Sequence, residues 1–302
     1  MEKLKFIPPG KSPEEISAGV WYPRCFSELC RAPSGLLATW WPSGLPHHIR
    51  ATANEWTFGA DKRYESGAAT GEEIRAEYLA KLAEVCAESN RLLRAEREDY
   101  LARSIPPEYR REIDRVQLKN PDAFDKVQTW TPAGERPSLI VFGDTGRGKT
   151  RAVFHRLATL HRERGTRFLA LTADELKRQL IAAALNSNTE DEVETIHYAE
   201  AIEFHRREPS SVEGRLRAAE IAFVDDLSQA KLTPHYAERF FALVEHRMAR
   251  GLPLIVTTQL DGNALVRKLA GYEDQFADTA ACLVRRLRDF CAPVNFGFDA
   301  AP

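Results

Sequence analysis

The octapeptide GDTGRGKT, Gly143 to Thr150, places the strongest constraint on how this chain folds. It matches the phosphate-binding pattern G-x-x-x-x-G-K-[ST] at every position. The apolar run SLIVF precedes it and the helical pattern RAVFHRLATLHRERG follows it. A strand that passes through a glycine-rich turn into a helix is the context in which this pattern binds nucleotides. The alternative, a tight turn with a solvated lysine, requires neither flank. We therefore predict a nucleotide-binding site.

The residue types of this loop explain how it would hold phosphate. Glycines let backbone N–H groups turn toward phosphate oxygens, and the N-terminus of the next helix adds a favourable field. We expect Lys149 to reach the outer phosphates and the Thr150 hydroxyl to ligate Mg²⁺. The predicted nucleotide-binding residues are Gly143, Asp144, Thr145, Gly146, Arg147, Gly148, Lys149 and Thr150.

The stretch EIAFVDD, Glu220 to Asp226, offers the acidic groups that such a site needs. Its apolar residues lead into two carboxylates at the end of an expected strand. We predict that Asp225 holds Mg²⁺ through water and that Asp226 polarises the attacking water. An acidic exit from a strand without a role in catalysis is the alternative, and the apolar lead-in favours the catalytic interpretation.

The pattern after Pro137 predicts the fold class. Short apolar runs alternate with helical patterns, and these runs are SLIVF, RFLAL, IAFV, PLIV and PVNF. This alternation is typical of a parallel sheet covered by helices. We predict an α/β fold with a P-loop core, in which helices flank the parallel sheet, over residues 105–302.

The part of the chain before this core differs from it in amino-acid composition and in periodicity. Residues 1–70 are rich in Pro, Gly and Trp and show no helical period, which predicts a small α+β or irregular domain that binds a partner. In residues 71–104, Ile74, Tyr78 and Leu82 recur at helical spacing with charged residues between them. We predict a helical connector there.

Composition excludes several classes of protein. A net charge of −2 argues against a strongly basic nucleic-acid coat, although a local basic channel is compatible with it. No apolar stretch approaches the roughly 20 residues that span a bilayer. The N-terminal sequence MEKLKFIPPG lacks the apolar core of a secretory signal, and the five cysteines are irregularly spaced. We expect a cytoplasmic protein with no membrane partner.

One group of residues raises the question of zinc. Cys25 and Cys30 are followed by the adjacent pair His47 and His48. Zinc sites usually have more closely spaced ligand pairs, and adjacent histidines are poorly placed to bind one ion together. Buried thiols and surface imidazoles are the favoured interpretation.

Three further segments resemble one branch of the AAA+ ATPases, the DnaC-type helicase loaders and their IstB relatives. RMARGLPLIVTTQL, Arg247 to Leu260, resembles the segment R-[YF]-x4-P-x-I-x-T-[ST]-N of that branch. CLVRRLRDFCAPVNF, Cys282 to Phe296, resembles its terminal R-[LIM]-R…V-x-F segment, and IPPEYR resembles its I-P-x-[RK]-[FY]-R entry. The resemblance covers about residues 105–296.

The resemblance implies roles for further residues. Thr258 and Gln259 fall at the sensor that reads the γ-phosphate, and with Lys149 and Asp226 they complete the expected catalytic set. Arg286 falls at the finger that reaches the nucleotide of a neighbouring subunit, with Arg285 as the alternative. Gln259 stands where the branch has Asn, and Asp226 stands where many AAA+ enzymes have Glu.

The resemblance also implies a function. It implies an ATPase that uses ATP and Mg²⁺ and has no C-terminal lid domain. Such a protein would self-associate into a ring or spiral. It would assemble with single-stranded DNA and a replicative helicase and act as the loader of that helicase. A transposition helper on duplex DNA and a nucleotide-switched adaptor with little turnover are the alternatives. The candidate phosphate contacts to DNA are Lys177, Arg178 and the Arg206/Arg207 pair, with ordinary surface charges as the alternative.

Overall fold

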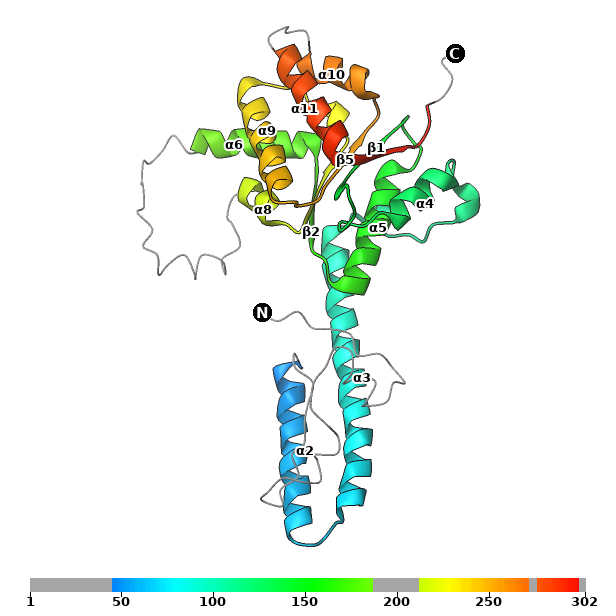
Figure 1. Ribbon diagram of the computed structural model, residues 1–302, viewed down its shortest axis with the longest axis vertical. Helices are drawn as coiled ribbons and strands as arrows, with labels where there is room; N and C mark the ends of the chain where they lie inside the picture. The colour runs from blue at the N-terminus through cyan, green and yellow to red at the C-terminus, as the bar shows by residue number, and fades with distance from the viewer. Residues whose placement is uncertain (1–44, 187–211, 272–275, 299–302) are drawn as a thin grey trace. The chain divides into compact units, whose positions relative to one another are not determined.

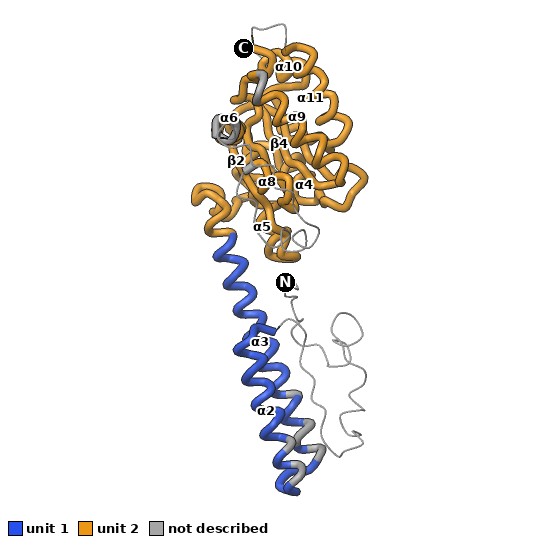
Figure 2. Tube along the Cα trace, turned by 90° about the vertical axis from the view of Figure 1, so that its left-hand side faces the viewer, with its two compact units in different colours: residues 1–100 blue, residues 101–302 orange. Residues whose placement is uncertain are grey.

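The computed structural model describes residues 45–186, 212–271 and 276–298 (Figure 1). The chain divides into two compact units, residues 1–100 and 101–302 (Figure 2). Cys25 and Cys30 lie outside the described residues. No group of three or more potential metal-ligating side chains occurs in the described part of the chain. None of its helices is long and apolar enough to cross a membrane.

The described part of the first unit is a pair of helices, α2 (His47–Glu65) and α3 (Gly71–Ser104), which lie side by side (Figure 1). The helix predicted for residues 71–104 is therefore present. The helix α2 lies within residues 1–70, where the sequence shows no clear helical period. Its buried positions Ile49, Ala53 and Ala60 follow a helical spacing, but two of them are small alanines, so the apolar period is faint in the sequence.

The second unit contains a five-stranded parallel sheet in the order β2-β3-β4-β1-β5. Its strands are β1 (Ser138–Phe142), β2 (Phe168–Thr172), β3 (Ile221–Asp225), β4 (Leu254–Thr258) and β5 (Cys291–Asn295). Each of the five predicted apolar runs forms one strand. The predicted fold class, an α/β fold with a parallel sheet flanked by helices, is confirmed.

Helices cover both faces of this sheet. They are α4 (Pro121–Thr129), α5 (Lys149–Arg164), α6 (Ala173–Asn186), α8 (Val212–Ala218), α9 (Pro234–Ala249), α10 (Gly262–Ala270) and α11 (Ala277–Phe290). Helices α6 and α8 to α11 share one apolar core with the Ala222 and Val224 side of β3. Because neighbouring residues of a strand point to opposite faces, Phe223 faces the other way, and there it meets Phe154 of α5.

A buried arginine fastens the edge of the sheet where β3 and β4 begin. The Arg247 side chain on α9 is fully buried, and its guanidinium donates hydrogen bonds to the carbonyls of Leu216, Ala219 and Pro253, the last at 2.6 Å. Burial lowers the pKa of Arg247 to about 10. Leu216 lies in the last turn of α8 and Ala219 directly follows that helix, where unpaired carbonyls and the helix dipole favour a cation.

Replacing Arg247 by methionine is expected to lower the free energy of unfolding by roughly 3–5 kcal/mol, because it removes the guanidinium donor from the carbonyls of Leu216 and Ala219 and one of the two donors from that of Pro253. Chemical denaturation measures this change. Arg250→Met is the matched control, since Arg250 is exposed just beyond the same helix and should cost under about 0.5 kcal/mol. Equal stabilities of the two variants would contradict the role given to Arg247.

Candidate nucleotide-binding site

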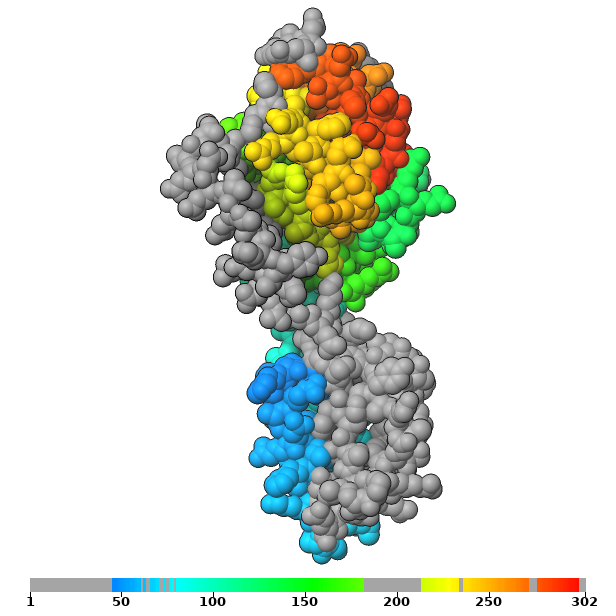
Figure 3. Space-filling view, turned by 60° about the vertical axis from the view of Figure 1, so that its left-hand side comes forward, coloured from blue at the N-terminus to red at the C-terminus, as the bar shows by residue number. Residues whose placement is uncertain are grey.

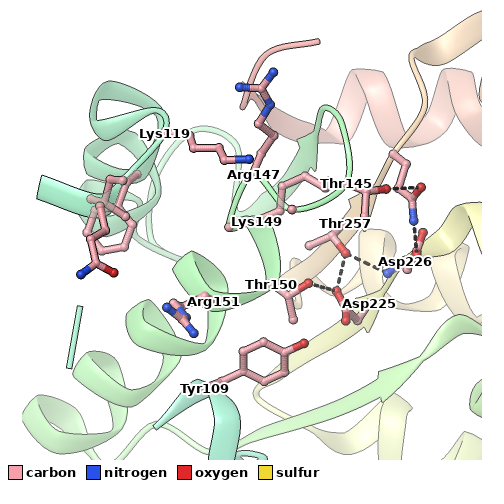
Figure 4. A pocket seen from close by; sticks show the side chains of 16 residues that line it. Tyr109, Lys119, Thr145, Arg147, Lys149, Thr150, Arg151, Asp225, Asp226 and Thr257 are labelled. Carbon is pink, nitrogen blue, oxygen red and sulfur yellow. Dashed lines mark hydrogen bonds between the residues drawn. The ribbon is translucent and has the colours of Figure 1, made fainter. Parts of the chain in front are cut away.

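A pocket of about 510 Å³ opens at the edge of the sheet where β1, β3 and β4 end (Figure 4). Because the strands are parallel, the loops that follow them meet at this edge, as in other open α/β sheets. Residues 145–151 form one wall, and the two acids after β3 with the end of β4 form another. A third wall comes from residues 109–124, upstream of β1.

The phosphate-loop backbone is held in a conformation that glycine permits. Gly143 has φ +135°, and a Cβ atom there would lie 2.7 Å from the carbonyl oxygen of Gly297. The amide of Asp144 donates to that same oxygen at 3.0 Å. Gly148 has φ +90° and directly precedes the first residue of α5. The loop is therefore tied to the segment after β5, and its end opens into a helix N-terminus.

Lys149 places a cation at the inner end of the loop. Its side chain is 8% exposed, and Nζ donates to the carbonyl oxygens of Gly143 at 2.6 Å and Asp144 at 2.8 Å. Burial lowers the pKa of Lys149, and the nearby carboxylates of Asp226, Asp225 and Asp144 oppose that shift. An entering phosphate would offer this ammonium a charged acceptor, which binds more strongly than a carbonyl.

The two predicted Mg²⁺ ligands lie next to each other. The Thr150 hydroxyl donates to Asp225 Oδ1 at 2.8 Å, and the Thr257 hydroxyl donates to the same oxygen at 2.5 Å (Figure 4). Burial raises the pKa of Asp225, and these two hydrogen bonds act in the opposite direction. A site of few protein oxygens beside a phosphate pocket suits Mg²⁺, which usually keeps several waters and binds with the phosphates of its substrate.

Asp226 adopts an unusual backbone conformation. Its φ of +51° is the only positive value at a non-glycine residue in the described part of the chain. Such a conformation costs of order 1 kcal/mol and is often found at functional sites. The carboxylate accepts hydrogen bonds from Ser228, from Gln229 at 3.1 Å and from Gln259 at 2.7 Å. Its amide donates to Thr257 Oγ1 at 2.8 Å.

Gln259 joins the phosphate loop to this acid. Its Nε2 donates to Asp226 Oδ2 at 2.7 Å, and its Oε1 accepts from Thr145 Oγ1 at 2.7 Å. The predicted sensor amide therefore lines the pocket. The structure places Thr258 differently from our expectation, because its hydroxyl accepts from the amide of Leu260 and it does not line the pocket. Thr257 lines the pocket instead, since neighbouring residues of β4 point to opposite faces.

Sequence reasoning missed the wall formed by residues 109–124. Tyr109, Lys119 and Phe124 line the pocket from this segment. The Tyr109 ring stacks on Phe154 of α5 with centroids 5.1 Å apart. Burial, and then the charge of Asp225, raise the pKa of Tyr109. The only signal in the sequence was the resemblance of IPPEYR to a family segment, and that resemblance carried no role for the tyrosine.

The predicted arginine finger lies outside the pocket of its own chain. Arg286 of α11 forms an ion pair with Glu245 of α9, with Nε and Oε1 3.1 Å apart. Helices α9 and α11, gold and orange-red in Figure 3, lie side by side at the surface. Arg285 is also exposed on α11.

The candidate DNA contacts are only partly described. Arg178 of α6 forms ion pairs with Asp174 and Glu175 of its own helix. Lys177 is half-buried on the same helix. The Arg206/Arg207 pair lies outside the described residues.

Comparison with known proteins finds likeness in fold. No family model and no curated protein matches the chain. It is similar to the crystal structure of DnaI, with a TM-score of 0.44 and 20% identity, over 63% of this chain and 94% of that one. A putative primosome component from Streptococcus pyogenes gives a TM-score of 0.43 and 16% identity, over 66% and 95% of the chains. The DnaC helicase loader gives a TM-score of 0.41 and 15% identity, over 63% and 99%.

Proposed function

We propose that this chain is a Mg²⁺-dependent ATPase of the DnaC-type loader kind. It would act in DNA replication, assembling with single-stranded DNA and a replicative helicase. The observation that carries the ATPase proposal is one pocket in which Lys149, the Thr150–Asp225 pair and Asp226 meet beside a glycine-turned loop. The resemblance of Arg247–Leu260 and Cys282–Phe296 to loader segments is the support for the role in replication.

Each group of residues in the pocket would have a distinct role in hydrolysis. The loop amides and Lys149 would bind the phosphates and stabilise the charge that develops on them during transfer. Thr150 and Asp225 would hold Mg²⁺, which neutralises phosphate charge when bound. Asp226 would accept a hydrogen bond from the attacking water and orient it. Gln259 hydrogen-bonds to both Asp226 and Thr145, and it thereby fixes the position of the Asp226 carboxylate relative to the phosphate loop.

A mixing experiment tests whether Arg286 acts on the nucleotide of the next subunit. We expect Arg286→Ala to bind ATP normally but to hydrolyse it poorly, by roughly a factor of 10³, because the guanidinium that neutralises transferring phosphate is missing. Mixed with Lys149→Ala, it should recover activity, since mixed assemblies pair an intact loop from one chain with an intact arginine from the other. Phosphate release with single-stranded DNA present is the measurement.

Arg267→Ala is the control for this experiment, because Arg267 is exposed on α10, lies outside the segments that resemble the loader family and does not line the pocket. It should retain activity without mixing. No recovery at any ratio of Arg286→Ala to Lys149→Ala, with co-assembly demonstrated, would exclude a role in trans.

DNA stimulation separates the proposed function from its alternatives. A loader predicts that single strands raise ATP turnover more than duplex does, with an affinity that falls steeply as salt rises. Stronger stimulation by duplex would favour the transposition helper. Turnover that no DNA affects would favour the nucleotide-switched adaptor.

A further inference from the structure

Tyr109 enters the nucleotide pocket from a segment that precedes the sheet. It ends a short 3-10 helix, Pro107–Tyr109, and its hydroxyl points toward the side of the pocket formed by Thr150 and Asp225 (Figure 4). Its ring stacks on Phe154, and Phe154 packs edge-on against Phe223, with centroids 5.2 Å apart. Because Phe223 belongs to the strand that ends at Asp225, this aromatic stack fixes the ring relative to that acid.

The other end of the segment is fastened to α3. The Arg110 guanidinium donates to the carbonyl oxygen of Ile105 at 2.6 Å and to that of Ala102. Ala102 lies in the last turn of α3, and Ile105 directly follows that helix. The segment Ile105–Arg110 therefore has one attachment at the end of α3 and one side chain in the pocket.

The chemistry of the phenol suits a contact with an anion. A tyrosine hydroxyl is protonated at neutral pH, so it donates a hydrogen bond without adding charge. A hydrogen bond to an ionised acceptor is roughly twice as strong as one between neutral groups. Within the described part of the chain, no hydrogen bond occupies the Tyr109 hydroxyl. Its hydrogen is available to a ligand on the Thr150 side.

We propose that Tyr109 donates a hydrogen bond to a phosphate oxygen of the bound Mg²⁺–nucleotide and thereby ties the segment Ile105–Arg110 to the occupied site. The inference rests on the proposed nucleotide function and adds a residue whose hydrogen bond forms only when nucleotide is bound in the pocket. Nucleotide binding then orders the segment that connects α3 to the ATPase core.

Tyr109→Phe tests the hydroxyl alone, because phenylalanine keeps the ring and its stack on Phe154. The affinity of the full chain for a non-hydrolysable ATP analogue with Mg²⁺, measured by calorimetry, should fall about tenfold. Tyr236→Phe is the matched control. Tyr236 is likewise stacked on a phenylalanine, Phe240, but does not line the pocket, so its variant should bind the analogue as the wild type does.

Hydrogen exchange tests the coupling itself. In the wild type, the analogue should slow amide exchange both in residues 143–150 and in residues 105–110. In Tyr109→Phe, saturated with the analogue, the slowing should persist in the loop and be lost in residues 105–110. Wild-type affinity in Tyr109→Phe, or protection of the loop without protection of residues 105–110 in the wild type, would overturn this inference alone. No protection of the loop in the wild type would overturn the proposed function as well.

Discussion

Lys149→Ala is expected to weaken ATP binding by at least about a hundredfold and to abolish turnover, because it removes the buried cation that faces the phosphates. In the structure this ammonium donates to two loop carbonyls. Alanine offers no donor to replace it, so a phosphate in the loop would remain uncompensated at its most enclosed point. Calorimetry with Mg²⁺ and a non-hydrolysable ATP analogue measures the loss of affinity.

Lys268→Ala is the control for this variant, since Lys268 is exposed on α10 and does not line the pocket. It should bind ATP as the wild type does. Circular dichroism should show that both variants keep their helical content. Hydrolysis at the wild-type rate by Lys149→Ala would exclude the proposed site.

Asp226→Asn is expected to keep Mg²⁺ and ATP bound but to reduce turnover by about 10²–10⁴-fold, because an amide accepts a proton far less readily than a carboxylate. The new NH₂ group would also face the amide donors of Gln229 and Gln259, which now bind the carboxylate. Single-turnover hydrolysis and equilibrium binding, measured on the same preparation, separate the two effects.

Asp225→Asn is the informative comparison. Asp225 interacts with both Thr150 and Thr257, so its amide variant should lose most of the Mg²⁺ dependence of nucleotide binding. If Asp226→Asn lost binding while its turnover per bound ATP stayed unchanged, the roles of the two acids would be reversed.

The parts of the core that depend on local sequence could be predicted. The five strands are short apolar runs bounded by polar segments, and a run of this length and composition is typical of a strand buried inside a sheet. The glycine loop could be predicted because its conformation needs glycine at Gly143 and Gly148. The carboxylates Asp225 and Asp226 could be placed in the pocket because parallel strands end at one edge.

Features that depend on orientation or on distant packing could not be predicted. Which of Thr257 and Thr258 faces the pocket is set by the register of β4 against β1 and β3, and the pair TT carries no such information. Tyr109 reaches the site through its stack on Phe154, a residue far along the chain. The αL backbone of Asp226 is likewise a product of the surrounding hydrogen bonds with Thr257 and its neighbours.

A crystal structure of the full chain with Mg²⁺ and a non-hydrolysable ATP analogue would show whether this pocket binds the nucleotide. We expect phosphates against the amides of residues 145–149, with the Lys149 ammonium on phosphate oxygens in place of the carbonyls of Gly143 and Asp144. We also expect a metal ion beside Thr150 and Asp225. A nucleotide bound elsewhere on the chain, with Lys149 still on the two loop carbonyls, would exclude the proposed site.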